Sequence, residues 1–357
     1  MKSKVYFIEV KDASDIWTVN NRLNKLLQES KVLDFIRKDS NIAIKLHFGE
    51  AGNGNFVRPE HVRVVCDGVV SRGAKPVLSD ANTLYRGRRL NSQDHLQLAY
   101  EHGFTKTATG ADVVIPDDNQ KDQITDVEIN QKAIKKAKLA RLFIDADGLV
   151  AVSHFKGHIL TGFGGTLKNI GMGCATREGK LAQHCDVSPV VYVDRCTGCA
   201  ECSIVCPVKA ITIKNKKSVV DSKKCIGCAS CLAACPTMAM FIDFGATDQV
   251  QQKVAEYSLA VLKDKKGKAG FLNFAVKISR ECDCWNLENP RIGPDVGILA
   301  SSDPVSIDKA SLDMVARDCK KDIFKAAHPD KDGVKQLMYA QEIGLGSLDY
   351  ELVEVRA

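Results

Sequence analysis

Eight of the fourteen cysteines fall into two runs that share one spacing. The first run is Cys196, Cys199, Cys202 and Cys206, and the second is Cys225, Cys228, Cys231 and Cys235. A proline follows each run, so both read C-x2-C-x2-C-x3-C-P. This spacing is typical of chains that hold two [4Fe-4S] clusters, because three thiolates of one tight loop can reach three irons of a cubane. The pattern therefore predicts single-electron chemistry.

The last cysteine of each run is expected to bind the cluster of the other run, as in bacterial two-cluster ferredoxins. One predicted cluster has the ligands Cys196, Cys199, Cys202 and Cys235, and the other has Cys225, Cys228, Cys231 and Cys206. Zinc prefers two separated pairs of ligands, and disulfides suit small secreted chains. Neither alternative matches the spacing as well as iron–sulfur clusters do.

Length and composition indicate a water-soluble globular chain of about two domains. The 357 residues are 45% hydrophobic and 26% charged. The N-terminal residues lack the apolar stretch of a signal peptide, and no run of about 18 apolar residues predicts a membrane span. We therefore expect a cytoplasmic protein without membrane contact, in which reduced cysteines bind metal.

The net charge of +6 counts every cysteine as neutral. Two oxidised clusters with their thiolates, each carrying roughly −2, would bring the protein close to neutrality. We therefore expect no nucleic-acid partner. Lysines flank the cysteine runs, at Lys209, Lys214, Lys216, Lys217, Lys223 and Lys224. They form either a solvated surface or a docking face for a redox partner such as ferredoxin or flavodoxin.

Short apolar segments alternate with amphipathic segments along most of the chain. Strands are expected at 4–10, 41–48, 74–80, 111–116, 148–155, 271–278, 295–301 and 350–355. Helices are expected at 15–30, 59–71, 91–102, 248–263, 304–318 and 334–342. This alternation predicts an α/β fold with a largely parallel or mixed sheet and helices on both faces.

The cysteine runs interrupt this pattern. We expect residues 1–187 and 246–357 to form one discontinuous α/β domain. Residues 188–245 would be an inserted α+β module of the two-cluster ferredoxin type, held together by its clusters more than by a core.

A second group of chemically versatile residues lies in the segment 153–173, SHFKGHILTGFGGTLKNIGMG. Gly162, Gly164 and Gly165 would let backbone amides approach a ligand, and a helix starting near Thr166 would favour an anion. Lys156 and Lys168 would add positive charge. The segment lacks the spacing of a Walker loop. A tight structural turn remains the alternative interpretation.

Further polar residues follow other predicted strands, namely His47, Glu50, Asp80, Asn82, Tyr85, Arg86, Cys282 and Cys284. Ligands bind at the carboxyl ends of strands in open α/β sheets, so a pocket is expected where these residues converge with His154 and His158. The candidate catalytic residues are His47, His154, Lys156, His158 and Lys168. Arg86 is a candidate anion ligand. Cys282 and Cys284 are either buried spare thiols, ligands of an additional metal ion, or a redox dithiol.

Five motifs, in this order, resemble the iron–sulfur proteins of the domain-of-unknown-function family 362. They are KLHFGE, SDANTLYRGRR, the segment 153–173, CDCW and DVGILASSDPVSIDKA. The resemblance implies an α/β domain, often with a two-cluster ferredoxin module inserted after the GFGG-LKN-GMG segment, in proteins found mainly in anaerobic microbes. It implies no particular reaction.

Three functional hypotheses fit these observations. The first is an oxidoreductase that passes single electrons from the clusters to an anionic small molecule or a metal site in the α/β domain. The second is a non-enzymatic electron carrier, redox sensor or assembly factor that binds a protein or metabolite. In the third, the clusters are structural and the α/β domain carries out transferase or ligase chemistry.

Overall fold

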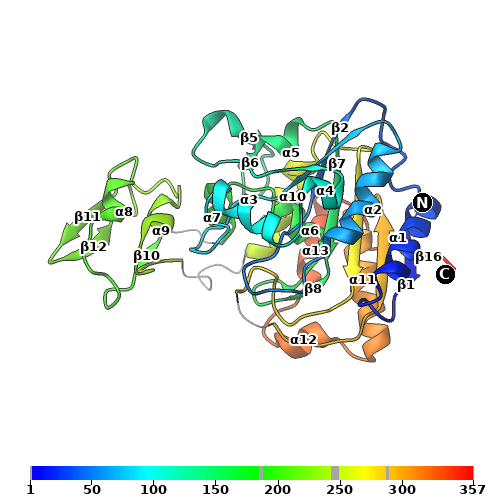
Figure 1. The fold of residues 1–357 in the computed structure, drawn as a ribbon. Coiled ribbons are helices and arrows are strands. Elements are labelled where there is room, and N and C mark those ends of the chain that lie inside the picture. The colour runs from blue at the N-terminus through cyan, green and yellow to red at the C-terminus, as the bar shows by residue number, and fades with distance from the viewer. Residues whose placement is uncertain (1, 185–187, 243–248, 287–288, 357) are drawn as a thin grey trace.

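An eight-stranded sheet forms the centre of the molecule (Figure 1). This computed structural model describes residues 2–184, 188–242, 249–286 and 289–356. The strand order is β16 (Tyr350–Glu354), β1 (Ser3–Glu9), β15 (Gly297–Ser301), β14 (Ala269–Ala275), β7 (Gly148–His154), β2 (Asn41–Lys45), β3 (Lys75–Ser79) and β4 (Asp112–Val114). Within this sheet β15 runs antiparallel to both of its neighbours, and all other pairs are parallel. The predicted largely parallel or mixed sheet is confirmed.

Helices cover both faces of the sheet, as predicted. One face carries α1 (Ile16–Ser30), α2 (Pro59–Val70) and α3 (Ser92–Glu101), and the other carries α6 (Thr166–Gly171), α10 (Val250–Leu262), α11 (Pro304–Cys319) and α13 (Val334–Glu342). Successive strand residues point to opposite faces. Accordingly Ile44 and Val150 belong to the first core, whereas their neighbours Ala43 and Ala151 belong to the second. The central residues of these strands are apolar because both faces are buried.

Helix starts follow from local chemistry. The predicted start of α2 at Pro59 is confirmed, since proline is tolerated where the first amide has no partner within the helix. At α11 the Asp303 carboxylate accepts hydrogen bonds from the amides of Val305 and Ser306, at 2.9 Å each. Such capping satisfies amide donors at the beginning of a helix.

Two hairpins were not predicted. They are β5 (Ile124–Glu128) with β6 (Lys136–Ala140), and β8 (Lys156–His158) with β9 (Gly162–Gly164). In the first hairpin, β6 alternates lysines with apolar residues, which is a strand signal that the prediction overlooked. The second hairpin is rich in glycine, which is depleted in strands. The predicted strand 41–48 was also too long, because β2 ends at Lys45.

Residues 188–242 contribute no strand to the large sheet. Their elements are β10 (Val190–Val191) paired with β13 (Met240–Phe241), β11 (Ile211–Lys214) paired with β12 (Lys217–Val220), and the helices α8 (Glu201–Ile204) and α9 (Ser230–Ala234). Figure 1 shows these elements to one side of the main body. The predicted boundaries, between 187 and 188 and between 245 and 246, adjoin or lie among residues 185–187 and 243–248, which are outside the described ranges, so the division into domains remains a prediction.

The two halves of this segment repeat each other in backbone conformation. Gly198 and Gly227 have φ angles of 74° and 70°, and Ala200 and Ala229 have φ angles of 65° and 61°. Each pair occupies matching positions in the two cysteine runs. The repeated left-handed residues curl both loops in the same way. Within the described ranges of the chain, no helix combines the length and the apolar character that crossing a membrane requires.

Candidate functional site

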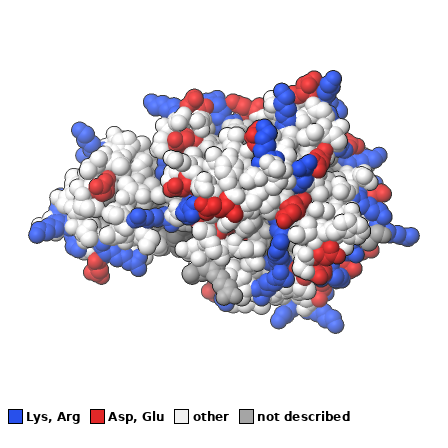
Figure 2. Space-filling model, viewed as in Figure 1, with Lys and Arg blue, Asp and Glu red and all other residues white. Residues whose placement is uncertain are grey.

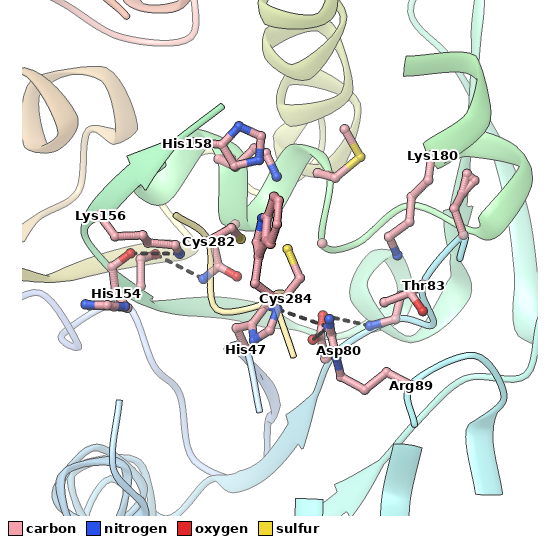
Figure 3. A pocket seen from close by; sticks show the side chains of 18 of the residues that line it. His47, Asp80, Thr83, Arg89, His154, Lys156, His158, Lys180, Cys282 and Cys284 are labelled. Atoms are coloured by element: carbon pink, nitrogen blue, oxygen red, sulfur yellow. Dashed lines mark hydrogen bonds and ion pairs between the residues drawn. The ribbon is translucent and has the colours of Figure 1, made fainter. Parts of the chain in front are cut away.

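A cavity of about 470 Å³ lies beyond the carboxyl ends of β2, β3 and β7 (Figure 3). These strands are parallel, so their carboxyl ends meet at one edge of the sheet and bring distant segments together. The ionisable residues in its wall are Lys45, His47, Asp80, Tyr85, Arg89, His154, Lys156, His158, Lys168, Lys180, His184, Cys282 and Cys284. All five candidate catalytic residues from the sequence therefore line one cavity, together with both candidate metal-binding cysteines.

Asp283, between the two cysteines, is held by the buried side chains of His154 and Lys156. Its Oδ1 lies 2.8 Å from Nδ1 of His154, and its Oδ2 lies 3.5 Å from Nζ of Lys156. Burial alone would raise the pKa of Asp283, but His154 and Lys156 outweigh it and lower the pKa to about 2. The second ring nitrogen of His154 contacts the carbonyl of Val276 at 3.0 Å. His154 thus has both nitrogens engaged and positions the cysteine loop.

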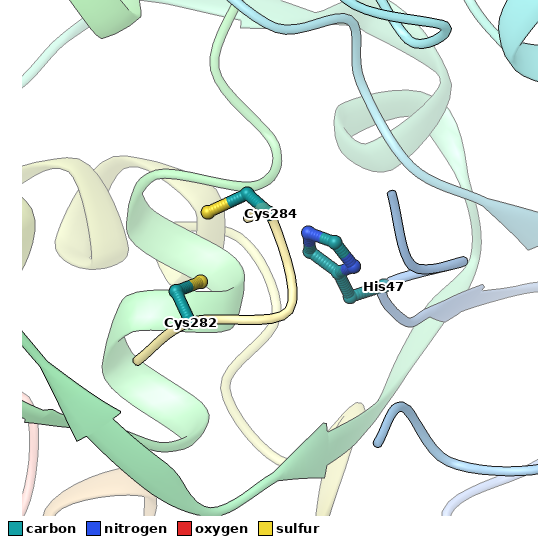
Figure 4. A group of neighbouring side chains, drawn as sticks. All are labelled: His47, Cys282 and Cys284. Atoms are coloured by element: carbon teal, nitrogen blue, oxygen red, sulfur yellow. The ribbon is translucent and has the colours of Figure 1, made fainter. Parts of the chain in front are cut away.

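His47, Cys282 and Cys284 form a compact group at the cavity wall (Figure 4). A ligand atom of each residue lies within 4.8 Å of the other two. The hydrogen bond from Cys284 lowers the pKa of Cys282 well below its ordinary value, and Lys156 acts in the same direction. That same hydrogen bond raises the pKa of Cys284.

His47 is held neutral by its surroundings. Burial and the charge of Arg89 hold its pKa well below the ordinary range. Its Nδ1 accepts a hydrogen bond of 2.9 Å from the amide of Gly49, and Nη1 of Arg89 lies 3.0 Å from its Nε2. Both neighbours are donors, and a neutral imidazole has one lone pair for them. Glu50 keeps Arg89 in place through a 3.0 Å ion pair.

His158 also lines the cavity as a neutral ring. Its Nδ1 lies 3.1 Å from the amide of Leu160 and 3.3 Å from the amide of Thr161. Burial, assisted by the charge of Lys168, holds its pKa well below the ordinary range. His158 therefore supports the β8–β9 turn through one nitrogen.

Two buried lysines in the wall were missed from the sequence. Nζ of Lys45 lies 2.9 Å from Oδ1 of Asp80 and 2.8 Å from Oδ1 of Asn169. Lys180, on α7 (Arg177–His184), donates to the carbonyl of Ala175 at 2.8 Å, and burial lowers its pKa to about 8. The one sequence signal for Lys45 was its position as a charged residue at the end of an otherwise apolar stretch. Nothing local marked Lys180.

The predicted anion site at the start of α6 is already filled by the protein itself. The amides of Thr166 and Leu167 donate to the carboxylate of Asp308 at 2.7 and 2.9 Å. Thr166, Gly162, Gly164 and Gly165 are absent from the cavity wall. The helix does start at Thr166 as expected, but a buried acid from α11 takes the place of the expected ligand. The geometry does not favour an anion-binding role for these four residues.

Arg86 also lies outside the cavity wall. Its Nη1 donates to the carbonyl of Pro236 at 2.6 Å, so it joins the main body to the cysteine segment. Leu84, two residues earlier, is buried in the same apolar cluster as Cys196 and Cys231. Leu84 also lines the cavity. Leu84 thus belongs both to the cavity wall and to the apolar cluster that extends into the cysteine-rich segment.

The cysteines of the two runs lie near one another, which is compatible with the crossed assignment. The thiols of Cys235, Cys196 and Cys199 act electrostatically on Cys202. Burial raises the pKa of Cys231 to about 12, and Cys228, Cys225, Cys202 and Cys206 raise it as well. Iron–sulfur clusters are bound by closely spaced cysteine sulfurs in apolar surroundings. These cysteines therefore fit as ligands of iron–sulfur clusters.

Matching amides point at the last cysteine of each run. The amide of Ala210 lies 3.2 Å from Sγ of Cys206, and the amide of Ala239 lies 3.2 Å from Sγ of Cys235. Hydrogen bonds to sulfur stabilise the thiolate form and tune the potential of a cluster.

A family model described as "Domain of unknown function (DUF362)" matches residues 42–313. The chain belongs to the DUF362 family. The DUF362 match begins in β2 and ends in α11, so it includes the cavity residues and both cysteine runs. The family resemblance seen in the motifs is confirmed, and the family description itself gives no reaction. No curated protein matches the chain.

Two solved structures show a loose likeness to this DUF362 protein. One is the lactate racemase apoprotein from Thermoanaerobacterium thermosaccharolyticum, with 15% identity and a TM-score of 0.37, covering 76% of this chain and 50% of that one. The other is a Thermotoga maritima protein from a structural genomics programme, with 11% identity and a TM-score of 0.42, covering 85% and 58%. The chain therefore spans half the length of the first protein and 58% of the second.

Proposed function

We propose that this protein is an iron–sulfur oxidoreductase. Two [4Fe-4S] clusters on the eight cysteines of the two runs would supply single electrons to an anionic substrate or a metal site in the cavity. The observation that carries the proposal is the position of Leu84, which lines the cavity and packs in the apolar cluster of Cys196 and Cys231. This shared side chain supports electron transfer between the cysteine-rich segment and the cavity.

The charges around the cavity support an anionic substrate. Lys168 lines the wall and is only 9% exposed, and within the described ranges its ammonium makes no hydrogen bond or ion pair. Lys180 bonds only a carbonyl oxygen there, whereas Lys45 is paired with Asp80. Burying a cation costs free energy unless an anion binds beside it. Lys168 and Lys180 would bind and orient such an anion.

A redox partner would dock on the exposed lysines of the cysteine segment. Figure 2 shows several basic side chains on the part of the surface that Figure 1 labels β11 and β12. Lys209, Lys214, Lys216, Lys223 and Lys224 are exposed there. Complementary charge speeds the encounter with an acidic carrier such as ferredoxin or flavodoxin.

Re-oxidation kinetics test the proposal. Anaerobic protein is reduced with dithionite, freed of excess reductant and mixed with a panel of small anionic acceptors, beginning with 2-oxo acids. We expect at least one acceptor to restore the visible absorption of the oxidised clusters, and Lys168→Met to slow it at least tenfold. The exposed Lys209→Met variant is the matched control. Re-oxidation by ferredoxin or flavodoxin alone, with every anion inert, would favour a non-enzymatic electron carrier.

A further inference from the structure

We propose that His47, Cys282 and Cys284 bind a single divalent metal ion of the zinc type, with one coordination position open to the cavity. This inference deepens the proposed function by naming a metal site in the same cavity. It does not depend on the iron–sulfur clusters, because none of its three residues belongs to the two cysteine runs.

The distances suit one metal ion. The three ligand atoms all lie within 4.8 Å of one another. Tetrahedral bonds of about 2.3 Å to sulfur and about 2.0 Å to nitrogen put neighbouring ligands about 3.5–3.8 Å apart. Small side-chain rotations are enough to close the site once one nitrogen of His47 exchanges its donor contact, with the amide of Gly49 or with Arg89, for the metal. Figure 4 shows the imidazole of His47 directed at the loop that carries both cysteines.

The two loops that carry these residues are fastened to each other. The amide of Glu50, three residues after His47, donates to the carbonyl of Asp283 at 3.0 Å. Nδ2 of Asn53 donates to the carbonyl of Trp285 at 3.3 Å. The side chain of Asp283 is in turn held by His154 at 2.8 Å. Ligands fixed by surrounding hydrogen bonds in this way lose little entropy when they bind a metal.

The donor types select the metal. Two sulfurs and one imidazole nitrogen suit zinc and other borderline ions rather than magnesium or calcium, which prefer oxygen. Asp80 is the one carboxylate in the described cavity wall, and it is paired with Lys45. Two thiolates would balance the charge of a divalent ion.

Three protein ligands leave one tetrahedral position for a water or a substrate, as in catalytic zinc sites. The three residues line the 470 Å³ cavity, and so do the buried lysines Lys168 and Lys180. An anion bound at the open position would therefore have both a metal ion and ammonium groups as partners. This arrangement would favour small carboxylates or phosphates.

Zinc K-edge X-ray absorption on the full-length chain tests the site. Anaerobic, iron-loaded protein is dialysed against zinc chloride, and the edge reports on zinc without interference from iron. We expect one zinc per chain with two sulfur neighbours at about 2.3 Å and light-atom neighbours at about 2.0 Å. Cys282→Ser, Cys284→Ser and His47→Gln should each lower zinc affinity at least a hundredfold. Cys319→Ser and His102→Gln are the matched controls.

The outcomes separate this inference from the proposed function. A two-sulfur zinc site in protein that holds no iron would support the inference while contradicting the iron–sulfur proposal. In fully iron-loaded protein, zinc bound by four sulfurs, no bound zinc, or zinc retained by all three variants would each overturn the inference. If Cys282→Ser protein fails to fold, the sulfur count at the zinc edge of the wild-type protein still decides the question.

Discussion

The carboxylate of Asp283 lies 2.8 Å from the imidazole of His154, and both side chains are buried beneath the loop that carries Cys282 and Cys284. The pair joins the end of β7 to a loop 129 residues away in the sequence. This link positions the two thiols at the cavity wall. It also explains why the histidine that ends β7 is buried.

Removing Asp283 should loosen this loop and destabilise the fold. In Asp283→Ala the buried His154 and Lys156 lose their shared partner, and breaking a buried charge pair typically costs about 3–5 kcal/mol. We expect a lower thermal midpoint at a fixed scan rate and weaker zinc binding. Asp264→Ala, at an exposed turn after α10, is the control and should change the midpoint little. An unchanged midpoint in Asp283→Ala would show that the pair does not hold the loop.

Anion binding in the cavity should weaken as pH rises through about 8. Burial lowers the pKa of Lys180 to about 8, so its ammonium charge is present below that pH and is lost above it. Sulfate keeps a constant charge over this range and serves as the probe in calorimetry at fixed ionic strength. We expect about tenfold weaker binding at about pH 9 than at about pH 7, since a charge-assisted hydrogen bond contributes about 1.5 kcal/mol. The Lys180→Met variant should bind sulfate weakly, with no fall in affinity over this pH range. If the affinity still falls, another group titrates there.

Asp308 should be essential for the stability of the main body. It accepts hydrogen bonds from the amides of Thr166 and Leu167 and from Nδ2 of Asn273, at 2.7, 2.9 and 2.8 Å. Asp308→Ala would leave three buried donors unpaired, at about 1–3 kcal/mol for each. We expect a large fall in the thermal midpoint, whereas Asp313→Ala on the same helix should change it only slightly. Equal effects of the two substitutions would contradict the structural role given to Asp308.

The crossed ligand assignment predicts which cluster each cysteine controls. Cys206 belongs to the first run but is assigned to the cluster of Cys225, Cys228 and Cys231. Cys206→Ala should therefore lower the iron content from about eight to about four per chain and leave the cluster of Cys196, Cys199, Cys202 and Cys235. Mössbauer spectra and iron analysis of the anaerobic protein measure this. Loss of the cluster of Cys196 instead, with retention of the other, would show that the ligands do not cross.

Much of the fold could be predicted from the sequence because its strands are short apolar runs separated by amphipathic helices. The same reasoning placed His47, His154 and Cys282 near one another, since parallel strands end at a common edge. The direction of β15 required long-range information, because antiparallel and parallel strands buried on both faces have similar sequences.

The remaining features of the cavity depend on contacts between distant segments. Nothing near Thr166 reveals that Asp308, 142 residues later, occupies the amides of its helix. Lys180 reads as a surface residue of a polar helix, and only packing of α7 against the main body buries it. Its depressed pKa follows from that burial.

The central claim is that two clusters on the eight cysteines exchange single electrons, and a reductive titration tests it most directly. Anaerobic protein with a measured iron content is titrated with dithionite while electron paramagnetic resonance is recorded. The account predicts about eight irons and two electrons taken up per chain, with spectra of two interacting reduced [4Fe-4S] clusters. A reconstituted protein that holds zinc instead of iron, or one that takes up no electrons, would contradict it.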